Sequence, residues 1–217
     1  NIPPQYFYGT GGGESYGPIT EGELVAKLTR GEQAYATLLY TRELGSWIPA
    51  CSVAHLRHLF RYVSIIENFL APSEAGALRD YTQAHAGLFA PGRLYDLETR
   101  ELAVTRERSS LCLTPDQSFI QPFLEKVRSI LPRMCAELKI APFEPGHIDC
   151  DITAYNDGHY IKAHVDNYPE SIAALTVSGV YYFFDEPRRF SGGELRILSA
   201  RKGEALAEIE PQNNTLA

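Results

Sequence analysis

Residues 154–167 read AYNDGHYIKAHVDN and place His164 and Asp166 two positions apart, after the turn residue Gly158. Residues i and i+2 of a strand project from the same face, so a strand here would aim an imidazole and a carboxylate at one point. Two histidines and one carboxylate on one face of Fe(II) form an oxygen-activating metal site that leaves coordination positions open. The pair alone is more often the polar end of a surface strand than a metal site, so both interpretations stay open at this point.

The sequence around this stretch changes its period from helical to strand-like. Ser73 begins a predicted helix that runs to about Leu88, and a second predicted helix covers residues 114–138, where Pro122 and Pro132 are expected to break or kink it. From Ile148 onward, apolar and polar residues alternate with the period of a half-buried strand. Further strand-like runs follow at residues 172–184, 194–198 and 205–209. Helices followed by many short strands predict a mostly β, α+β fold with helices outside a sandwich or jelly roll.

The first 52 residues form a separate pattern. An aromatic strand at residues 6–8 and a glycine-rich hairpin precede Thr20, which with Glu23 has the spacing of a helix capping box. Strand-like residues 37–40 follow the helix, and Trp47 closes the segment. This order resembles the small α+β GYF-like module, which implies binding of peptides or partner proteins, often proline-rich, through exposed aromatic side chains. The alternative is that these aromatic residues form only the core of a tiny domain.

Composition excludes several classes of function. The chain of 217 residues carries a formal net charge of −7, whereas nucleic-acid binding depends on clustered Lys and Arg. No apolar run reaches the roughly 20 residues of a membrane-spanning helix, and the sequence shows no signal pattern at its start, so a cytoplasmic protein without membrane association is expected. The four cysteines stand apart without a metal-binding spacing, which predicts reduced, buried thiols.

Several motifs occur in order from residue 60 to residue 217. Besides His164 and Asp166 they are Tyr-Asn-Asp-Gly at 155–158, Val-Tyr-Tyr-Phe at 180–183, Phe-Ser-Gly-Gly-Glu-Leu-Arg at 190–196 and Ile-Glu-Pro at 209–211. Together they resemble the Fe(II)- and 2-oxoglutarate-dependent dioxygenases of the prolyl-hydroxylase type. The resemblance implies a double-stranded β-helix domain over residues 60–217, behind the GYF-like domain of residues 1–52.

The same resemblance implies roles for particular residues. His164 and Asp166 correspond to two iron ligands, and the residues expected at the 2-oxoglutarate pocket are Tyr155, Val180, Tyr182 and Leu195. Without the family pattern, Tyr182 and Leu195 would be interpreted as filling of a barrel interior. The cofactors implied are Fe(II), 2-oxoglutarate and O₂, with ascorbate as an optional addition, and the substrate implied is a peptide or protein residue, with proline the expected target.

The sequence departs from the family at its end. A second iron-binding histidine and a basic residue that pairs with 2-oxoglutarate are expected shortly after residue 211, and neither is present, so we expect the sequence to be truncated. His159, His85 and His147 lack a spacing that would replace the missing ligand. The alternatives are a non-catalytic adaptor that carries a peptide-binding module on a jelly-roll scaffold, and a dioxygenase acting on a small molecule. Oligomeric state and the ligand of the GYF-like domain stay open.

Overall fold

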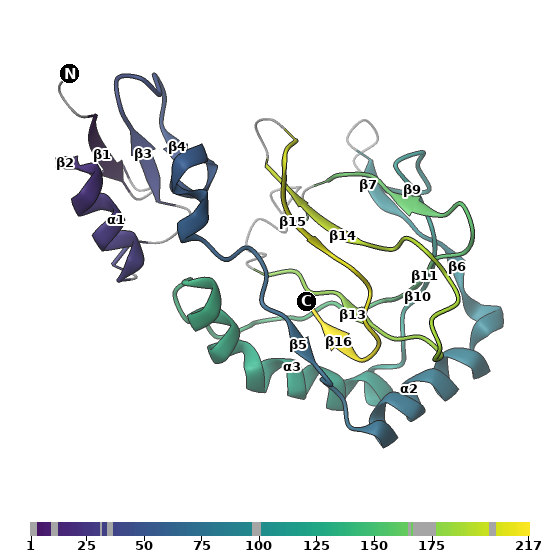
Figure 1. Cartoon of the computed structure of the whole chain (residues 1–217). Coiled ribbons are helices and arrows are strands. Elements are labelled where there is room, and N and C mark those ends of the chain that lie inside the picture. The colour runs from purple at the N-terminus through teal and green to yellow at the C-terminus, as the bar shows by residue number, and fades with distance from the viewer. Residues whose placement is uncertain are drawn as a thin grey trace. The chain divides into compact units, whose positions relative to one another are not determined.

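The structure is a computed structural model that describes residues 4–9, 13–30, 32–33, 37–96, 101–164, 166, 177–199 and 203–217, with backbone alone at 95–96 and 101–102. The chain divides into two compact units. Unit 1 comprises residues 1–64, 128–144 and 196–207, and unit 2 comprises residues 65–127, 145–195 and 208–217. Short strands and three α-helices make up the described part, which is a mixed helix-and-strand structure (Figure 1).

The N-terminal part of unit 1 is an antiparallel sheet with one helix. Its strands are ordered β2-β1-β3-β4 and run over Gln5–Gly9 (β1), Ser15–Thr20 (β2), Leu38–Tyr40 (β3) and Ile48–Pro49 (β4). Helix α1, Glu21–Thr29, begins with the predicted capping box, in which Glu23 N donates to Thr20 Oγ1 at 3.3 Å and Thr20 N donates to Glu23 Oε2 at 2.8 Å. Both strand predictions in this segment are confirmed.

One apolar core holds this sheet and helix together. It consists of Tyr6, Leu24, Leu28, Leu39, Ile48, Ala50, Val53 and Leu56, each at most 6% exposed. Leu56 belongs to the 3₁₀ turn Ala54–Leu59, and Val53 lies between this turn and the 3₁₀ turn Ala50–Ser52, so the core extends beyond residue 52. The division of the chain at residues 52 and 60 stays a prediction, and so does the resemblance to a GYF-like module.

In unit 2, helices lie against small antiparallel sheets. Helix α2 spans Pro72–Ala84 and is followed by the 3₁₀ turn Ala86–Leu88, while α3 spans Gln117–Leu138 and passes from unit 2 into unit 1. The ring of Phe123 on α3 meets the rings of Phe69 and Tyr181 edge to face, with centroids 5.5 Å and 5.4 Å away. This contact packs the first part of α3 onto the sheet that carries Tyr181.

The strands after residue 64 form several small sheets, and those within residues 195–209 lie mostly in unit 1. One sheet has the order β13-β16-β5 and a second the order β11-β10-β6, while β12 pairs with β9, β14 with β15 and β7 with β8. Their bounds are Ile66–Glu67 (β5), Ala90–Pro91 (β6), Leu94–Asp96 (β7), Glu101–Ala103 (β8), Arg108–Ser109 (β9), Leu111–Leu113 (β10), Ile152–Ala154 (β11), Tyr160–Ile161 (β12), Tyr181–Tyr182 (β13), Leu195–Leu198 (β14), Ala205–Ile209 (β15) and Thr215–Leu216 (β16). The arrangement is consistent with an oxygenase jelly roll.

Asn214 joins the last strand to the chain entering α2. Its backbone is left-handed, with φ of 58°, and its side chain exchanges two hydrogen bonds of 2.8 Å with the backbone of Leu70. Its Oδ1 also accepts the hydroxyl of Tyr181 at 2.9 Å. Asparagine is one of the few residues that tolerate this backbone conformation, and its amide supplies both a donor and an acceptor.

Several sequence-based boundaries need correction. The strands at Leu195–Leu198 and Ala205–Ile209 are confirmed, but the strand predicted from residue 148 is confined to Ile152–Ala154. Most of the predicted strand 172–184 lies outside the described residues, apart from Tyr181–Tyr182. Helix α2, which was predicted to begin at Ser73 and to run to about Leu88, begins at Pro72 and ends at Ala84, so Ser73 is not its N-cap. At this end of the helix Ala71 N donates a hydrogen bond to Glu74 Oε2 at 2.6 Å.

Helix α3 is continuous through both of its prolines, which corrects the expected break. A proline in a helix interior removes one backbone hydrogen bond and crowds the preceding turn. Buried side chains on both sides of the two prolines offset that cost, since Leu124, Leu131 and Met134 are each at most 8% exposed. Of the four cysteines, which are all free, only Cys135 is fully buried, so the prediction of buried thiols is wrong for the other three.

Candidate metal and cosubstrate site

His164 and Asp166 meet, although not on a strand. Strand β12 ends at Ile161, residues 162–164 are irregular and Asp166 lies in a turn, so the predicted strand geometry is wrong. Their side chains nevertheless converge, with His164 Nε2 3.1 Å from Asp166 Oδ1. The approach is fixed by β12, which pairs with β9, and by Lys162 N, which donates to Glu107 O at 2.8 Å.

The hydrogen bond on the far side of the His164 ring determines which nitrogen carries the proton. His164 Nδ1 lies 2.8 Å from the carbonyl oxygen of Lys162, and a carbonyl can only accept, so Nδ1 is the protonated nitrogen. In the neutral ring Nε2 therefore presents a lone pair toward the Asp166 carboxylate. Two lone pairs repel at this distance unless a proton or a metal cation lies between them. Metal-binding histidines are oriented in this way by a carbonyl on the other nitrogen.

The second carboxylate oxygen of Asp166 also accepts a hydrogen bond. Ser178 Oγ donates to Asp166 Oδ2 at 2.5 Å, which leaves Oδ1 as the oxygen that faces His164. The two side chains are 39% and 47% exposed, so the pair lies at an open surface. Nothing in the sequence alone pointed to Ser178, because it lies 12 residues after Asp166 and only folding brings the two side chains together.

The donor set fits two positions of a ferrous site. Two donors that are each about 2.1 Å from one divalent ion, at about a right angle, lie about 3 Å apart, which is close to the observed separation. An imidazole nitrogen and a carboxylate oxygen are the ligand types of the two-histidine, one-carboxylate site. Among the described residues, no group of three His, Cys, Asp or Glu side chains could hold a metal ion. The described residues therefore offer two candidate donors, His164 and Asp166, and no third beside them.

Three of the four predicted cosubstrate residues come together. The Tyr182 hydroxyl on β13 donates to Gly193 O at 3.1 Å, and the pKa of this tyrosine is raised by burial, with Tyr155 and Leu195 among the groups close enough to act on it. Tyr155 follows β11 and is 49% exposed. Burial also raises the pKa of Tyr155, so both hydroxyls keep their protons at neutral pH and can donate hydrogen bonds.

Val180, the fourth predicted cosubstrate residue, pairs with Ala217 through its backbone. Its N–H donates to Ala217 O at 2.8 Å and its carbonyl accepts from Ala217 N at 2.9 Å, while its side chain is 37% exposed. Within the part of the chain that is described, no hydrogen bond or ion pair links His164 or Asp166 to Tyr155, Tyr182 or Leu195. The predicted roles of all six residues in binding metal and cosubstrate stay predictions.

Comparison with known proteins supports the oxygenase interpretation of this region. Residues 150–217 match the 2OG-Fe(II) oxygenase superfamily. This oxygenase segment includes Tyr155, His164, Asp166 and Tyr182, and amounts to less than a third of the chain. In addition, 92 residues are 39% identical to a protein of Synechocystis sp. (strain ATCC 27184 / PCC 6803 / Kazusa) described as an uncharacterized PKHD-type hydroxylase. That stretch covers 42% of this chain and 27% of the Synechocystis protein. No solved structure matches.

None of the helices among the described residues combines the length and the apolar content that crossing a membrane requires.

Proposed function

We propose that the protein is an Fe(II)- and 2-oxoglutarate-dependent dioxygenase that hydroxylates a peptide or protein residue, with proline as the expected target, in the cytoplasm. The observation that carries this proposal is the pairing of His164 Nε2 and Asp166 Oδ1 at 3.1 Å with Nδ1 and Oδ2 both occupied elsewhere. Each side chain is turned so that one unshared donor atom faces the same point. The match of residues 150–217 to the oxygenase superfamily supports the identity of the ion.

The residues of the chain have separate tasks in this proposal. His164 and Asp166 hold the metal ion, and the Lys162 carbonyl and Ser178 orient these two ligands. The single O–H of Tyr182 turns from Gly193 O, its acceptor in the structure, and donates to a cosubstrate carboxylate. Bound iron, with ascorbate as an optional reductant, supplies chemistry in which 2-oxoglutarate and O₂ yield succinate and CO₂ while one oxygen atom enters the substrate C–H bond. The remaining metal ligand comes from outside the residues described.

A matched pair of variants tests the metal site. His147 and Asp149 have the same two-residue spacing and a similar separation, 2.9 Å between Nε2 and Oδ1, but are 78% and 93% exposed. Full-length protein carrying His164→Ala should lose Fe(II) binding and iron-dependent succinate formation, whereas His147→Ala should keep both. Turnover would be followed as succinate and as a substrate mass gain of one oxygen atom. Equal iron binding by the His164→Ala variant and the parent would exclude the proposed site.

A second function is favoured by the aromatic surface of the N-terminal module. Phe7, Tyr16 and Trp47 are 36%, 49% and 42% exposed, and the ring of Trp47 lies 5.6 Å from that of Tyr40. Exposed, adjacent rings are the surfaces on which extended proline-rich peptides dock. We propose that this module binds a proline-containing peptide segment of a substrate or partner, an activity that would remain if the chain were a non-catalytic adaptor.

The only tryptophan of the sequence makes this second proposal measurable. Titration of the full-length protein with a proline-rich peptide should change Trp47 fluorescence, and Tyr40→Ala should weaken the binding. Loss of peptide turnover but not of small-molecule turnover in the Tyr40→Ala protein would identify the module as a substrate-binding part. A fluorescence signal that no proline-rich peptide changes would exclude it.

A further inference from the structure

Arg108 is a half-buried arginine of unit 2 whose guanidinium is hydrogen-bonded to neutral side chains. It lies on β9, the partner strand of β12, which leads to His164. Its guanidinium is fixed by Nε donating to Ser110 Oγ at 2.6 Å and by Nη2 donating to Cys112 Sγ at 2.8 Å and to Thr153 Oγ1 at 3.2 Å. A fourth bond, from Nη1 to Arg93 O, is long at 3.4 Å.

The neighbouring backbone is adapted to this side chain. A Cβ atom at Gly92 would lie 2.6 Å from Arg108 Nε and 2.5 Å from Ser110 Oγ, so only glycine leaves room for the guanidinium there. Gly92 N in turn donates to Ser110 O at 2.8 Å, which ties the glycine to the strand beside it. The arginine is therefore held rigidly, with its plane set by three neutral side chains.

The charge of Arg108 has no acidic partner among the described side chains. All four of its hydrogen-bond acceptors are neutral, and the adjacent Glu107 pairs with Lys162 at 3.0 Å. A guanidinium has five N–H groups, so one N–H of Nη1 has no acceptor in this set. Removing a charge from water is costly unless an opposite charge or a strong hydrogen bond compensates it, so a rigid, uncompensated guanidinium favours an anionic ligand.

Tyr155 supplies a second donor at the same place. Thr153, which accepts a hydrogen bond from Arg108 Nη2, lies on β11, and Tyr155 directly follows that strand. The charge of Arg108 also opposes the rise that burial causes in the pKa of Tyr155. The aromatic ring of Tyr155 is 49% exposed, which leaves this place accessible.

We propose that Arg108 and Tyr155 form a carboxylate-binding subsite in which Nη1–H and the phenol O–H bind one carboxylate group. The inference rests on the proposed dioxygenase function for the source of that group, which is either 2-oxoglutarate or an acidic residue of the substrate. No bond is made or broken in this subsite; it binds and orients its ligand.

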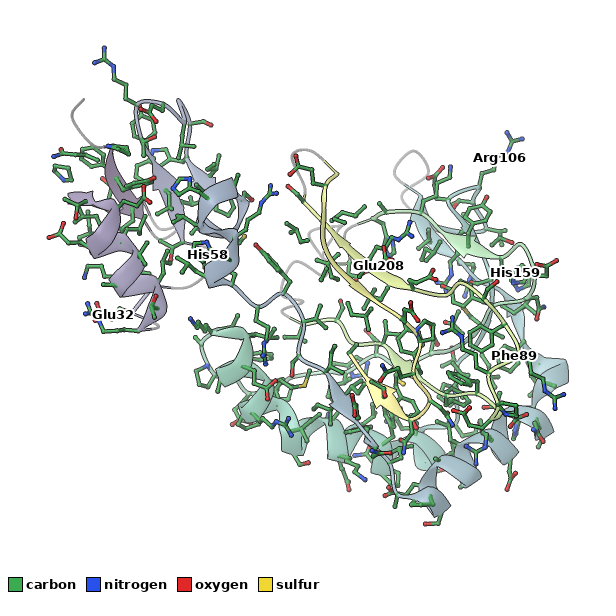
Figure 2. All side chains as sticks on the ribbon, in the orientation of Figure 1. Glu32, His58, Phe89, Arg106, His159 and Glu208 are labelled. Atoms are coloured by element: carbon green, nitrogen blue, oxygen red, sulfur yellow. The ribbon has the colours of Figure 1, made fainter. Side chains whose placement is uncertain are left out.

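The test measures binding rather than turnover. Full-length parent protein and the variants Arg108→Gln and Arg108→Lys would be titrated calorimetrically with 2-oxoglutarate in the presence of Mn(II), and with proline-containing peptides carrying Glu or Gln beside the proline. Arg108→Gln should weaken binding of the carboxylate ligand about tenfold or more, the loss expected for a charged hydrogen bond, and Arg108→Lys should recover part of it. Arg106→Gln is the matched control, because Arg106 carries the same charge two residues away and projects outward (Figure 2).

Each result assigns or removes the subsite. Weaker binding of 2-oxoglutarate places the cosubstrate carboxylate at Arg108, whereas unchanged 2-oxoglutarate binding with loss of the preference for Glu over Gln places a substrate carboxylate there. Unchanged binding of both ligands by a folded Arg108→Gln protein overturns the proposal. If that variant does not fold, the Nε–H NMR signal of Arg108 in the parent protein, assigned from its absence in Arg108→Lys, must shift on titration with either ligand, and a signal that stays in place overturns it.

The same measurements separate this inference from the proposed function. A carboxylate that binds through Arg108 in a protein producing no succinate would contradict the dioxygenase activity alone. Iron-dependent succinate formation with unaltered binding in the Arg108 variants would contradict the subsite alone.

Discussion

Ser178→Ala tests whether a residue outside the ligand pair controls metal affinity. The Ser178 hydroxyl donates to Asp166 Oδ2 at 2.5 Å and so keeps Oδ1 facing His164. Hydrogen bonds to charged groups contribute about 1.5–3 kcal/mol, and because the Asp166 side chain is 47% exposed, water replaces part of the lost bond and the lower end applies. A loss of about 1.5 kcal/mol corresponds to about tenfold weaker binding, which agrees with the roughly 10–100-fold effect of residues that orient metal ligands.

The assay is an anaerobic titration of the full-length protein with Fe(II), with thermal melting to show that each variant is folded. Asp166→Asn should abolish measurable binding, Ser178→Ala should weaken it about tenfold, and Ser15→Ala, at an exposed strand position of unit 1, should leave it unchanged. Equal affinities for the parent, Ser178→Ala and Asp166→Asn would refute the metal-site reasoning. Loss with Asp166→Asn but not with Ser178→Ala would refute only the orienting role of Ser178.

Three further predictions concern the core, the cosubstrate residues and pH. Leu24→Ala, at a fully buried position, should lower the free energy of unfolding by about 2–5 kcal/mol in a urea titration and leave Fe(II) affinity unchanged; a loss within 0.5 kcal/mol, about that of a surface site, would contradict the core assignment. Tyr182→Phe should raise the apparent KM for 2-oxoglutarate about fivefold or more, with a smaller change in kcat, and an unchanged KM would argue against its hydroxyl as a donor. The pKa of Glu74 is lowered by the hydrogen bond from Lys126 and then by that from Ala71 N, so its stabilising contribution exists above the unfolded pKa of the carboxyl and is lost as pH falls through the lower folded pKa. Glu74→Gln should therefore lower the melting temperature at pH 7 and leave it unchanged well below that folded pKa; an equal decrease at both pH values would contradict this linkage.

The elements that the sequence predicted correctly are those whose signals are local. The capping box at Thr20 and Glu23 involves atoms three residues apart, and the strand-like run at Ala205–Ile209 is a stretch of five consecutive residues. In the same way, the residue types His164 and Asp166 identified a candidate ligand pair before their positions were known. Neighbouring residues are sufficient for such signals, because the chain itself holds the interacting groups close together.

Tertiary structure decided what these local patterns could not. His164 and Asp166 converge from irregular backbone rather than from a strand, and the contacts that orient them include a carbonyl two residues away and Ser178, 12 residues away. Arg108 is fixed by Thr153, which is 45 residues distant in sequence, and Gly92 leaves space for it. Residue type and spacing thus determined which chemistry the chain could perform. The direction of each donor atom depended on hydrogen bonds between segments that only folding brings together, because a side chain takes its orientation from all of its neighbours and not only from those adjacent in sequence.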